Sequence, residues 1–507
     1  MTTRRCYWVI AAFTVLLACG YAALDRLAPG GRRLVKIEGV DTVNYFDVTH
    51  SLVFDHDFNL NNEYVRVPPS DRELTPIQSA TGLPASPWPV GYSLIEIPAL
   101  VLGTLLDAMT GSPADGYSWL ALYCYCLENV FLAGLGMFFL FRLLSEAAPG
   151  FGLAVSEANG FSLFIAFAVF AGTNVGYYSL THLSHTATIL FATIFLWWWW
   201  KIKSANDARS WMLLGVAGGC LSICRWQDLI FLGGPFLFDL IGTRTRLRPL
   251  VWLQTRLLYI FTALACWIPQ LIEWKVIYGK YVVNPHQGDV TFSFPPPYLW
   301  LVLLSSRNGW LLWTPLIGFG LAGLAFATVR SLRLFAPWIA VIVLELILIG
   351  SMNEWHGGDS FSSRYMMSTT PIVAIGILAL FSVLHRAGRT VLACAMGVCC
   401  VYTVLFAVQL RLWLIPSEET LTSKELLSDK LHILSVRRQK AAASRARELA
   451  AEGRFDAAGE VLADVAKLGD DRDVLAATVA AYRAGGRPQL AEQAEARRQR
   501  YLATRLN

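Results

Sequence analysis

The sequence predicts an all-α protein that crosses a membrane many times. Of its 507 residues, 55% are hydrophobic and only 16% are charged, and the mean hydropathy is +0.46. A soluble chain of this length is rarely so apolar. Apolar windows of roughly 17 to 25 residues, the length that crosses a bilayer as a helix, recur from the N-terminus to about residue 411.

We interpret about eleven of these windows as transmembrane helices. The first follows Arg4 and Arg5 as a signal peptide would, but its apolar run is long, so we expect it to be retained. The windows lie at residues 7–28, 118–141, 158–177, 186–200, 211–224, 228–242, 254–274, 308–328, 335–351, 366–384 and 390–411.

Basic residues predict the orientation, because short loops rich in Arg and Lys stay in the cytoplasm. Their clusters all lie inside only if the segment 90–108, which carries Glu96 and Pro98, does not cross. We therefore expect 90–108 to be a juxtamembrane or re-entrant helix, with the N-terminus in the cytoplasm. The outer face then carries loops 29–117, 178–185, 275–307 and 352–365, together with the tail from Pro416.

The predicted orientation divides the chain into four regions: a first helix at 1–28, an outer loop at 29–117, the remaining bundle at 118–415 and a helical tail at 416–507. In the tail, spacings typical of a tetratricopeptide unit recur about one period apart, at Leu449, Gly453, Phe455 and Ala458 and then at Tyr482, Gly485 and Ala491. Two units are fewer than a free solenoid needs, so we expect the tail to pack on the bundle or on a protein partner. A solvated amphipathic cap is the alternative.

Composition also excludes several classes of function. The ten cysteines all lie in or beside apolar windows, which indicates neither a disulfide framework nor a zinc site. The net charge of +5 is spread over short loops and a mixed-charge tail, without a basic stripe broken by aromatic residues. Nucleic acid is therefore not an expected partner.

Asp41 is the leading candidate for chemistry. It follows the first membrane helix, and Tyr45, Phe46 and Val48 after it begin an amphipathic stripe that predicts a helix lying along the membrane interface. Asp41 would begin that helix and face a cavity on the outer side. The alternative is a solvated loop carboxylate or a helix N-cap.

Charged and imidazole side chains in later segments are further candidates. Arg225 interrupts an apolar run, which indicates either a functional site or a buried pair with Asp228. Arg307 and Arg364 lie at outer helix ends, where they could bind phosphate or simply extend to the interface. His182 and His185 are three residues apart, so they could share one helix face at the cavity or cap a helix.

The sequence implies no cofactor firmly. Asp55 and Asp57 flank His56 in the first outer loop and could bind a divalent cation, but two carboxylates at this spacing are common in turns. They are weak metal candidates.

The order of short motifs over residues 1 to about 410 resembles the GT-C superfamily, membrane glycosyltransferases that use polyprenyl-phosphate sugars. Protein O-mannosyltransferases and the lipid A aminoarabinose transferase belong to it. The motifs are Asp41-x-x-x-Tyr45-Phe46, Ser51 to Asp57, Asn62-Glu63-Tyr64, Tyr177-Tyr178 with His182 and His185, Arg225-Trp226-Gln227, Ile268-Pro269-Gln270, Ser305-Ser306-Arg307-Asn308-Gly309, and Trp355-His356-Gly357-Gly358-Asp359 with Arg364.

The resemblance implies that Asp41 is a general base and that the sugar moves to a lipid, glycan or protein acceptor outside the membrane, by analogy a bacterial inner membrane. Many members carry a second acidic residue where this chain has Thr42, and a Lys or His near Pro87, where this chain has none. The expected substrate-binding residues are Tyr45, His182, His185, Arg225, Gln227, Arg307, Trp355, His356 and Arg364.

The expected chemistry also follows from the residue types. A polyprenyl phosphate is already a good leaving group, so inverting transfer needs mainly a base on the acceptor hydroxyl and cations on the departing phosphate. Two alternatives remain. One is a flippase or transporter of lipid-linked sugars, although such proteins usually show two related halves, which this sequence does not. The other is a non-catalytic assembly protein whose tail recruits a partner.

Overall fold

The computed structural model describes residues 1–27, 37, 39–66, 79–205, 207–242, 249–286 and 290–505. The regular elements of this part of the chain are helices, without a β-strand, and two isolated bridges join Phe292 with Met352 and Thr422 with Arg505. The predicted all-α class is therefore confirmed.

The helices before the tail are α1 (Thr3–Leu27), α2 (Val40–His50), α3 (Asn61–Arg66), α4 (Val90–Thr110), α5 (Trp119–Ala147), α6 (Val155–Gly172), α7 (Val175–Tyr178), α8 (His185–Ile202), α9 (Ala208–Cys224), α10 (Gly233–Ile241), α11 (Pro249–Ala265), α12 (Ile268–Tyr278), α13 (Leu299–Leu304), α14 (Trp310–Trp313), α15 (Leu316–Arg330), α16 (Leu332–Ser351), α17 (Thr370–Val383) and α18 (Arg386–Arg411). The tail holds α19 (Ser423–Leu427), α20 (Ile433–Ala451), α21 (Phe455–Ala466), α22 (Arg472–Ala484) and α23 (Pro488–Leu502).

Six helical segments of the described chain are long and apolar enough to cross a membrane, which indicates a membrane protein. They are Thr3–Ala23, Val90–Thr110, Trp119–Phe151, Leu332–Ser351, Arg364–Val383 and Arg386–Arg411. The bent pair formed by α11 and α12 could add a seventh. The larger count of about eleven includes shorter apolar helices and stays a prediction. The segment 90–108 is helical and has the length of a span, so its juxtamembrane placement also stays a prediction.

Five of the predicted windows are not single α-helices, and proline lies at or beside the break in four of them. The window 158–177 breaks between α6 and α7 without a proline, and 366–384 begins as the 3₁₀ helix Arg364–Thr369 just before Pro371. The window 254–274 breaks between α11 and α12, which meet at an angle of 40° next to Pro269. The window 308–328 breaks at Pro315, and 228–242 starts as a 3₁₀ turn before α10, which contains Pro235. Proline lacks an N–H and disfavours helical geometry in the residue before it, so a continuous apolar pattern does not ensure a continuous helix.

The core of the bundle depends on close helix contacts. Helix α17 is buried along almost its whole length, and α15 crosses it at small residues. A Cβ atom on Gly323 would lie 1.9 Å from the carbonyl oxygen of Gly376, so the two backbones touch and only glycine fits. Small residues at helix crossings are typical of membrane bundles, where tight van der Waals contact replaces the hydrophobic effect.

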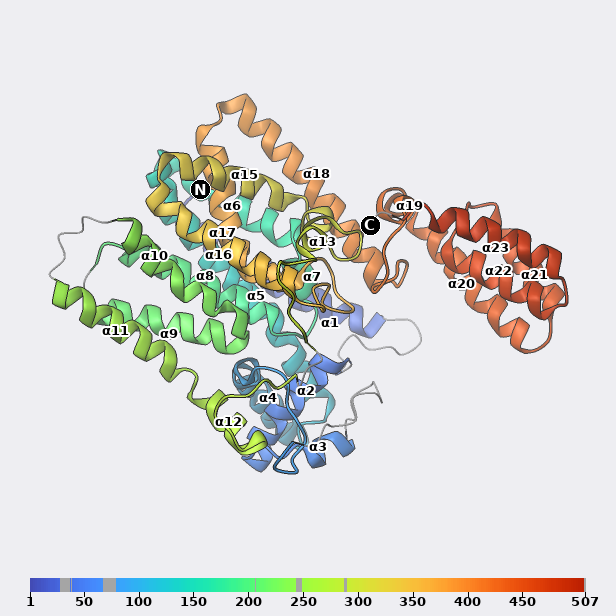
Figure 1. Cartoon of the computed structure of the whole chain (residues 1–507), viewed down its shortest axis with the longest axis horizontal. Helices are drawn as coiled ribbons and strands as arrows, with labels where there is room; N and C mark the ends of the chain where they lie inside the picture. Colours follow the sequence, from blue (N-terminus) through green and yellow to red (C-terminus); the bar gives the residue numbers. More distant parts are fainter. Residues whose placement is uncertain are drawn as a thin grey trace.

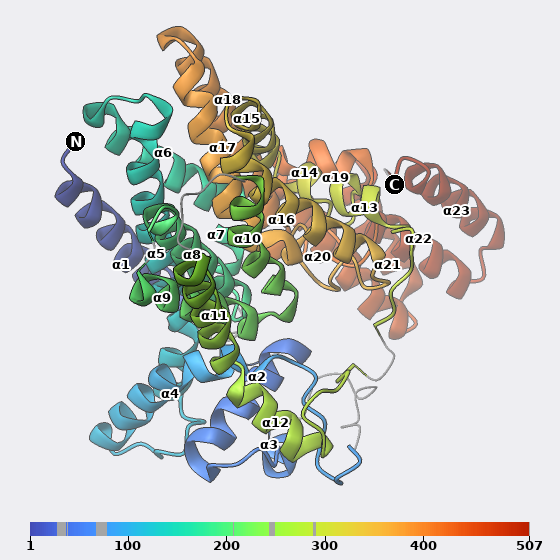
Figure 2. The same ribbon diagram turned by 60° about the vertical axis from the view of Figure 1, so that its left-hand side comes forward.

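The first outer loop folds into helices that gather at one end of the bundle. Figures 1 and 2 show α2, α3, α4 and α12 together there, below the long helices. Helix α2 is buried from Thr42 to His50, so it is not the amphipathic interfacial helix that the sequence predicts. Its neighbours cover the face that was expected to meet water, and α2 continues into a π-helix at Ser51–Asp55.

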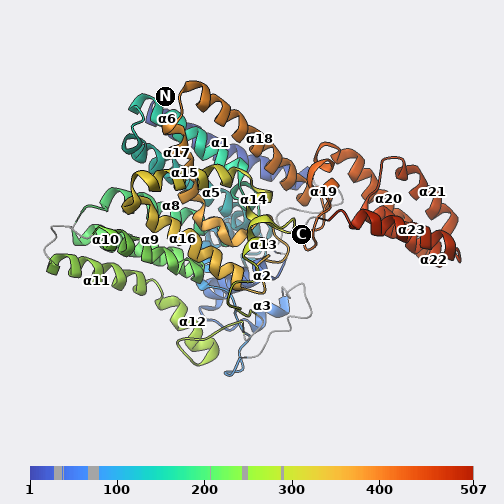
Figure 3. The same cartoon turned by 45° about the horizontal axis from the view of Figure 1, so that its top comes forward.

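The tail projects from one side of the bundle as two helical hairpins, α20 with α21 and α22 with α23 (Figures 1 and 3). Ala458 is fully buried and Ala491 nearly so, at corresponding places in the second helix of each hairpin. A connecting segment attaches the tail, since Lys430 donates to Gln409 of α18 over 3.1 Å and the Leu421 N–H donates to Ser306 Oγ over 2.9 Å. The connecting segment therefore packs on the bundle, whereas the two hairpins project from it, and a role of the tail in binding the bundle or a partner stays a prediction.

Candidate functional site

Asp41 lies in the first turn of α2 and is held on both carboxylate oxygens. Its Oδ2 forms an ion pair with Arg364 Nη1 over 2.7 Å, and its Oδ1 accepts a hydrogen bond from Trp88 Nε1 over 3.0 Å. The Asp41 side chain remains 25% exposed. Gly39 occupies the N-cap position, and no side chain caps the helix. Asp41 is therefore neither a solvated loop carboxylate nor the N-cap of α2, and its orientation is fixed by two donors.

Arg364 reaches Asp41 from the loop before α17, where the backbone leaves little room. Gly357 has a φ of +71°, and a Cβ atom there would lie 2.9 Å from Arg364 Nε. Glycine adopts this left-handed conformation without strain, so the loop can run directly along the guanidinium. Most of the Arg364 side chain is shielded from solvent, at 14% exposure.

A second guanidinium stands close by. Arg225 follows α9 in extended conformation, and its Nη1 lies 3.1 Å from His185 Nδ1 at the start of α8. Because guanidinium nitrogens only donate, this ring nitrogen must accept, and His185 is neutral in this arrangement. The predicted alternative, a pair with Asp228, does not form: the hydrogen bonds of Arg225 go to His185 and Gln227.

Tyr365 joins the two cations. The Arg225 guanidinium carbon lies 4.9 Å from the centre of the Tyr365 ring, and that of Arg364 lies 5.5 Å from it. Gln227 donates to the Tyr365 carbonyl over 2.8 Å and to Glu345 over 3.1 Å, which fixes this segment against α16. The two guanidinium groups at this ring repel each other, and a nearby anion offsets that repulsion.

Tyr45 and His182 belong to a buried layer that holds α2 in place. Tyr45 donates to Ser184 Oγ over 3.1 Å, and the His182 carbonyl accepts from Thr42 Oγ1 over 2.9 Å. The His182 ring pairs with Glu96 of α4, which is fully buried. Little of Tyr45 or His182 is exposed, so the structure favours a positioning role for both over direct contact with a substrate.

His356 lies within electrostatic range of both Arg307 and Arg364. The Gly358 N–H donates to His356 Nδ1 over 3.0 Å. Burial, then the charges of Arg307 and Arg364, lower the pKa of His356 to about 4. Trp355 is buried and stacks on Tyr298 with ring centres 6.3 Å apart, so its place is in the packing of this loop.

The three candidate arginines have unused hydrogen-bond capacity. The Nε atoms of Arg225, Arg307 and Arg364 are all buried, and none has a hydrogen-bond partner among the described residues. Leaving a buried donor on a charged group unsatisfied costs free energy, which binding of an anion or of water would recover. The arrangement therefore combines a held carboxylate with cations suited to a phosphate.

Asp55 and Asp57, the weak metal candidates, do not come together as a ligand pair. Asp57 Oδ1 accepts from Ser51 Oγ over 3.0 Å and from the Asn59 N–H over 2.9 Å, which is the turn that the sequence allowed as the alternative. Asp55 lies instead near His50 and Glu63.

Trp88 and Tyr365 were missed by sequence reasoning. Trp88 lies between Pro87 and Pro89, in a motif noted only for its lack of a basic residue. Tyr365 directly follows a predicted residue, Arg364. An aromatic side chain beside a candidate charge in an outer loop was the available signal in both cases.

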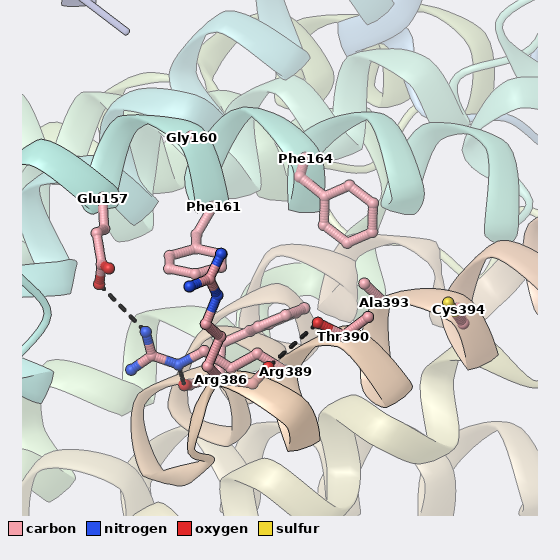
Figure 4. Close-up of a pocket in the computed structure, with 10 residues that line it drawn as sticks. Glu157, Gly160, Phe161, Phe164, Arg386, Arg389, Thr390, Ala393 and Cys394 are labelled. Atoms are coloured by element: carbon pink, nitrogen blue, oxygen red, sulfur yellow. Dashed lines mark hydrogen bonds and ion pairs between the residues drawn. The ribbon is translucent and has the colours of Figure 1, made fainter.

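A large surface hollow lies elsewhere, between α6, α17 and α18 (Figure 4). It has a volume of about 840 Å³ and contains the ion pair of Arg389 with Glu157 at 3.1 Å. None of the candidate site residues lines it. Figures 1 and 2 place the start of α18 at the end of the bundle opposite α2.

Neither a scan against models of protein families nor a search of curated proteins finds a match to this chain.

Proposed function

We propose that this protein is an inverting membrane glycosyltransferase that moves a sugar from a polyprenyl-phosphate donor to a lipid, glycan or protein acceptor. The observation that carries the proposal is the meeting of Asp41 with Arg364, beside Arg225 and Tyr365, at the end of the bundle where the outer-loop helices gather. A carboxylate and two guanidinium groups at one place are the parts that this reaction requires.

Asp41 accepts the proton of the acceptor hydroxyl as its oxygen attacks the anomeric carbon of the sugar. The bond between that carbon and the phosphate oxygen breaks, and its electron pair stays with the polyprenyl phosphate. Arg225 and Arg364 donate N–H groups to the departing phosphate oxygens, where negative charge increases. The Trp88 indole N–H keeps Asp41 turned toward the acceptor.

The proposal places this site and the tail on the outer face of a bacterial inner membrane, with the N-terminus in the cytoplasm and about eleven spans. Membrane lipids surround the bundle. The two hairpins of the tail, with spacing like that of tetratricopeptide units, could take a further protein partner.

The test compares glycans and glycolipids, by mass spectrometry, from cells with the gene, without it, and with the Asp41→Asn variant. A product that depends on the gene and disappears with Asp41→Asn at normal protein level supports the enzyme. Asp239→Asn is the matched control, because Asp239 forms an ion pair of the same 2.7 Å length with Arg256 away from the site. Equal product loss in both variants would indicate damaged folding and not lost chemistry.

A further inference from the structure

Three potential metal ligands converge in the first outer loop, away from Asp41. His50 ends α2, Asp55 ends the π-helix that follows, and Glu63 lies in α3. One ligand atom from each lies within 4.8 Å of the other two. In a tetrahedral site with bonds of about 2.0–2.2 Å the ligand atoms lie about 3.3–3.6 Å apart, so a pair separated by up to 4.8 Å must close by about 1.3 Å on binding.

The hydrogen bonds of His50 leave one ring nitrogen facing a carboxylate. Its Nε2 lies 3.0 Å from the carbonyl oxygen of Asp115, and because a carbonyl only accepts, Nε2 carries a proton. Its Nδ1 lies 3.2 Å from Glu63 Oε1. In a neutral ring these two atoms are both acceptors, so either a second proton or a cation must lie between them. A ligating histidine typically donates its other N–H to a carbonyl in this way.

The imidazole is fixed by its neighbours before any ligand arrives. The His50 ring stacks on Phe54 at 4.5 Å and lies 4.3 Å from Tyr117. Gly116, with a φ of +76°, passes so close that a Cβ atom there would lie 2.6 Å from Phe54 and 2.9 Å from His50. Because this packing already orients the His50 imidazole, little conformational entropy is lost when the ring binds an ion.

Unpartnered carboxylate oxygens surround the cluster. Glu63 Oε2 and both oxygens of Asp47 are buried, and none has a hydrogen-bond partner in the described part of the chain. Asp47 is fully buried one turn before His50 on α2. The nearby Arg66 is engaged in an ion pair with Asp115. Asp55 Oδ2 and Glu63 Oε1 accept from the Asn62 amide over 2.9 and 3.0 Å, and within the described chain neither carboxylate forms an ion pair with a Lys or Arg.

We propose that His50, Asp55 and Glu63 bind one divalent ion of the Zn²⁺ or Mn²⁺ class, with Asp47 as a neighbouring carboxylate. An imidazole nitrogen with carboxylate oxygens suits these ions, whereas Ca²⁺ prefers six to eight oxygen ligands. His50 lies nine residues after Asp41, about 13 Å along the helix, so the ion is separate from the proposed catalytic carboxylate. It fastens α3 and the loop around Asp115 to the end of α2.

The test uses the full chain in lipid nanodiscs, stripped with a chelator and dialysed. Isothermal titration with Zn²⁺ and Mn²⁺, and the loss of the Mn²⁺ paramagnetic resonance signal, measure binding. We expect one ion per chain and a higher melting temperature with the ion bound. Asp55→Asn should weaken binding about tenfold or more, since even the loss of a group behind a ligand costs that much. Asp55 is exposed, so this variant is expected to fold.

Asp57→Asn is the matched control, because Asp57 is an exposed carboxylate two residues away that lies outside the cluster. Its affinity should equal that of the unchanged protein. The proposal is overturned if the unchanged protein binds neither ion, or if Asp55→Asn and Glu63→Gln bind it undiminished. His50 and Glu63 would then be an ion pair, and chelation would leave the melting temperature unchanged. None of these readouts depends on glycosyl transfer.

Discussion

Asp41 and Arg364 are 323 residues apart in the sequence and form an ion pair of 2.7 Å between α2 and the loop that precedes α17. The pair couples the start of α2 to the segment that leads into α17. It also holds a carboxylate and a guanidinium side by side as an ionic pair, because arginine stays protonated.

The Asp41→Asn variant should lower transfer by a factor of about a hundred or more while expression stays normal, because the amide keeps the shape of the side chain but cannot accept a proton. Initial rates of the purified variant in nanodiscs measure the effect. The amide oxygen can accept from Trp88 or from Arg364 but not from both, so the melting temperature should fall, and the rates are compared well below it. Near-normal turnover would remove Asp41 as the base.

Substitutions of Arg225 test whether its positive charge or its forked guanidinium binds the sugar donor. Arg225→Lys keeps the charge and loses the forked donor, so donor affinity should fall partly, whereas Arg225→Ala should weaken it at least about tenfold. Donor binding is measured by titration, with melting temperature alongside.

Asp228 supplies the control for Arg225. Because the two side chains do not pair, adding Asp228→Ala to Arg225→Ala should restore neither donor affinity nor stability. Recovery of stability in the double variant would show a structural pair and would take Arg225 out of the proposed site.

The sequence predicts the helices better than it predicts the site. Apolar runs of spanning length mostly form helices, and the prolines at or beside four of the five breaks are visible in the sequence. The hydrogen-bond partners of Arg225 were harder to predict from the sequence. Asp228 is three residues away and looks like a local partner, but Arg225 has an extended backbone with φ −151° and ψ 115°, and this turns its side chain toward His185. A single main-chain conformation thus decides which pair forms.

The burial of α2 also could not be predicted from the sequence. The apolar stripe after Asp41 predicts an interfacial helix, yet α2 is covered on its polar face as well, by residues such as Ser93 and Glu96 of α4. Composition cannot reveal a cover that comes from a segment some fifty residues later. The pairing of Asp41 with Arg364 depends on the same long-range packing.

The stability of the folded protein should fall in acid partly through His356. With a pKa of about 4 in the fold and about 6.5 when unfolded, the unfolded chain binds an extra proton between these values. The free energy of unfolding therefore decreases as pH drops from about 6.5 to 4, by about 1–2 kcal/mol once solvent screening is allowed for. In His356→Gln, the melting temperature should fall less between pH 7 and 4.5 than in the unchanged protein.

His56, which is exposed, is the control for His356. His56→Gln should leave the pH dependence of melting as it is in the unchanged protein. An identical acid profile for His356→Gln and the unchanged protein would contradict the assignment.

The placement of α4 can be measured directly. Its length allows it to cross, but the basic loops require that it does not, and Ala114 just beyond it is exposed. In a background without reactive native cysteines, Ala114→Cys should react with an impermeant maleimide from outside in intact cells. Ser204→Cys, in a loop expected inside, should be protected. Protection of Ala114→Cys would mean that α4 spans the membrane and that the helix count changes.

The attachment of the tail depends on Arg472. Its guanidinium donates to Glu425 over 3.0 and 3.1 Å and to Glu419 over 2.7 Å, and Glu425 is almost fully buried. Arg472→Ala would leave that carboxylate without its partner, at a cost of about 3–5 kcal/mol. Limited proteolysis should then cut between residues 412 and 432 at lower protease concentration, while the bundle keeps its melting temperature.

Arg438→Ala is the matched control for the tail. Arg438 pairs with Asp464 over 3.1 Å, but both side chains are more than half exposed, and such pairs contribute less than about 1 kcal/mol. Cleavage of this variant should match that of the unchanged protein. Replacing Glu425 with Gln in the Arg472→Ala background removes the buried charge and should slow cleavage again. If that double variant is cut as fast as Arg472→Ala alone, the buried charge is not what loosens the tail.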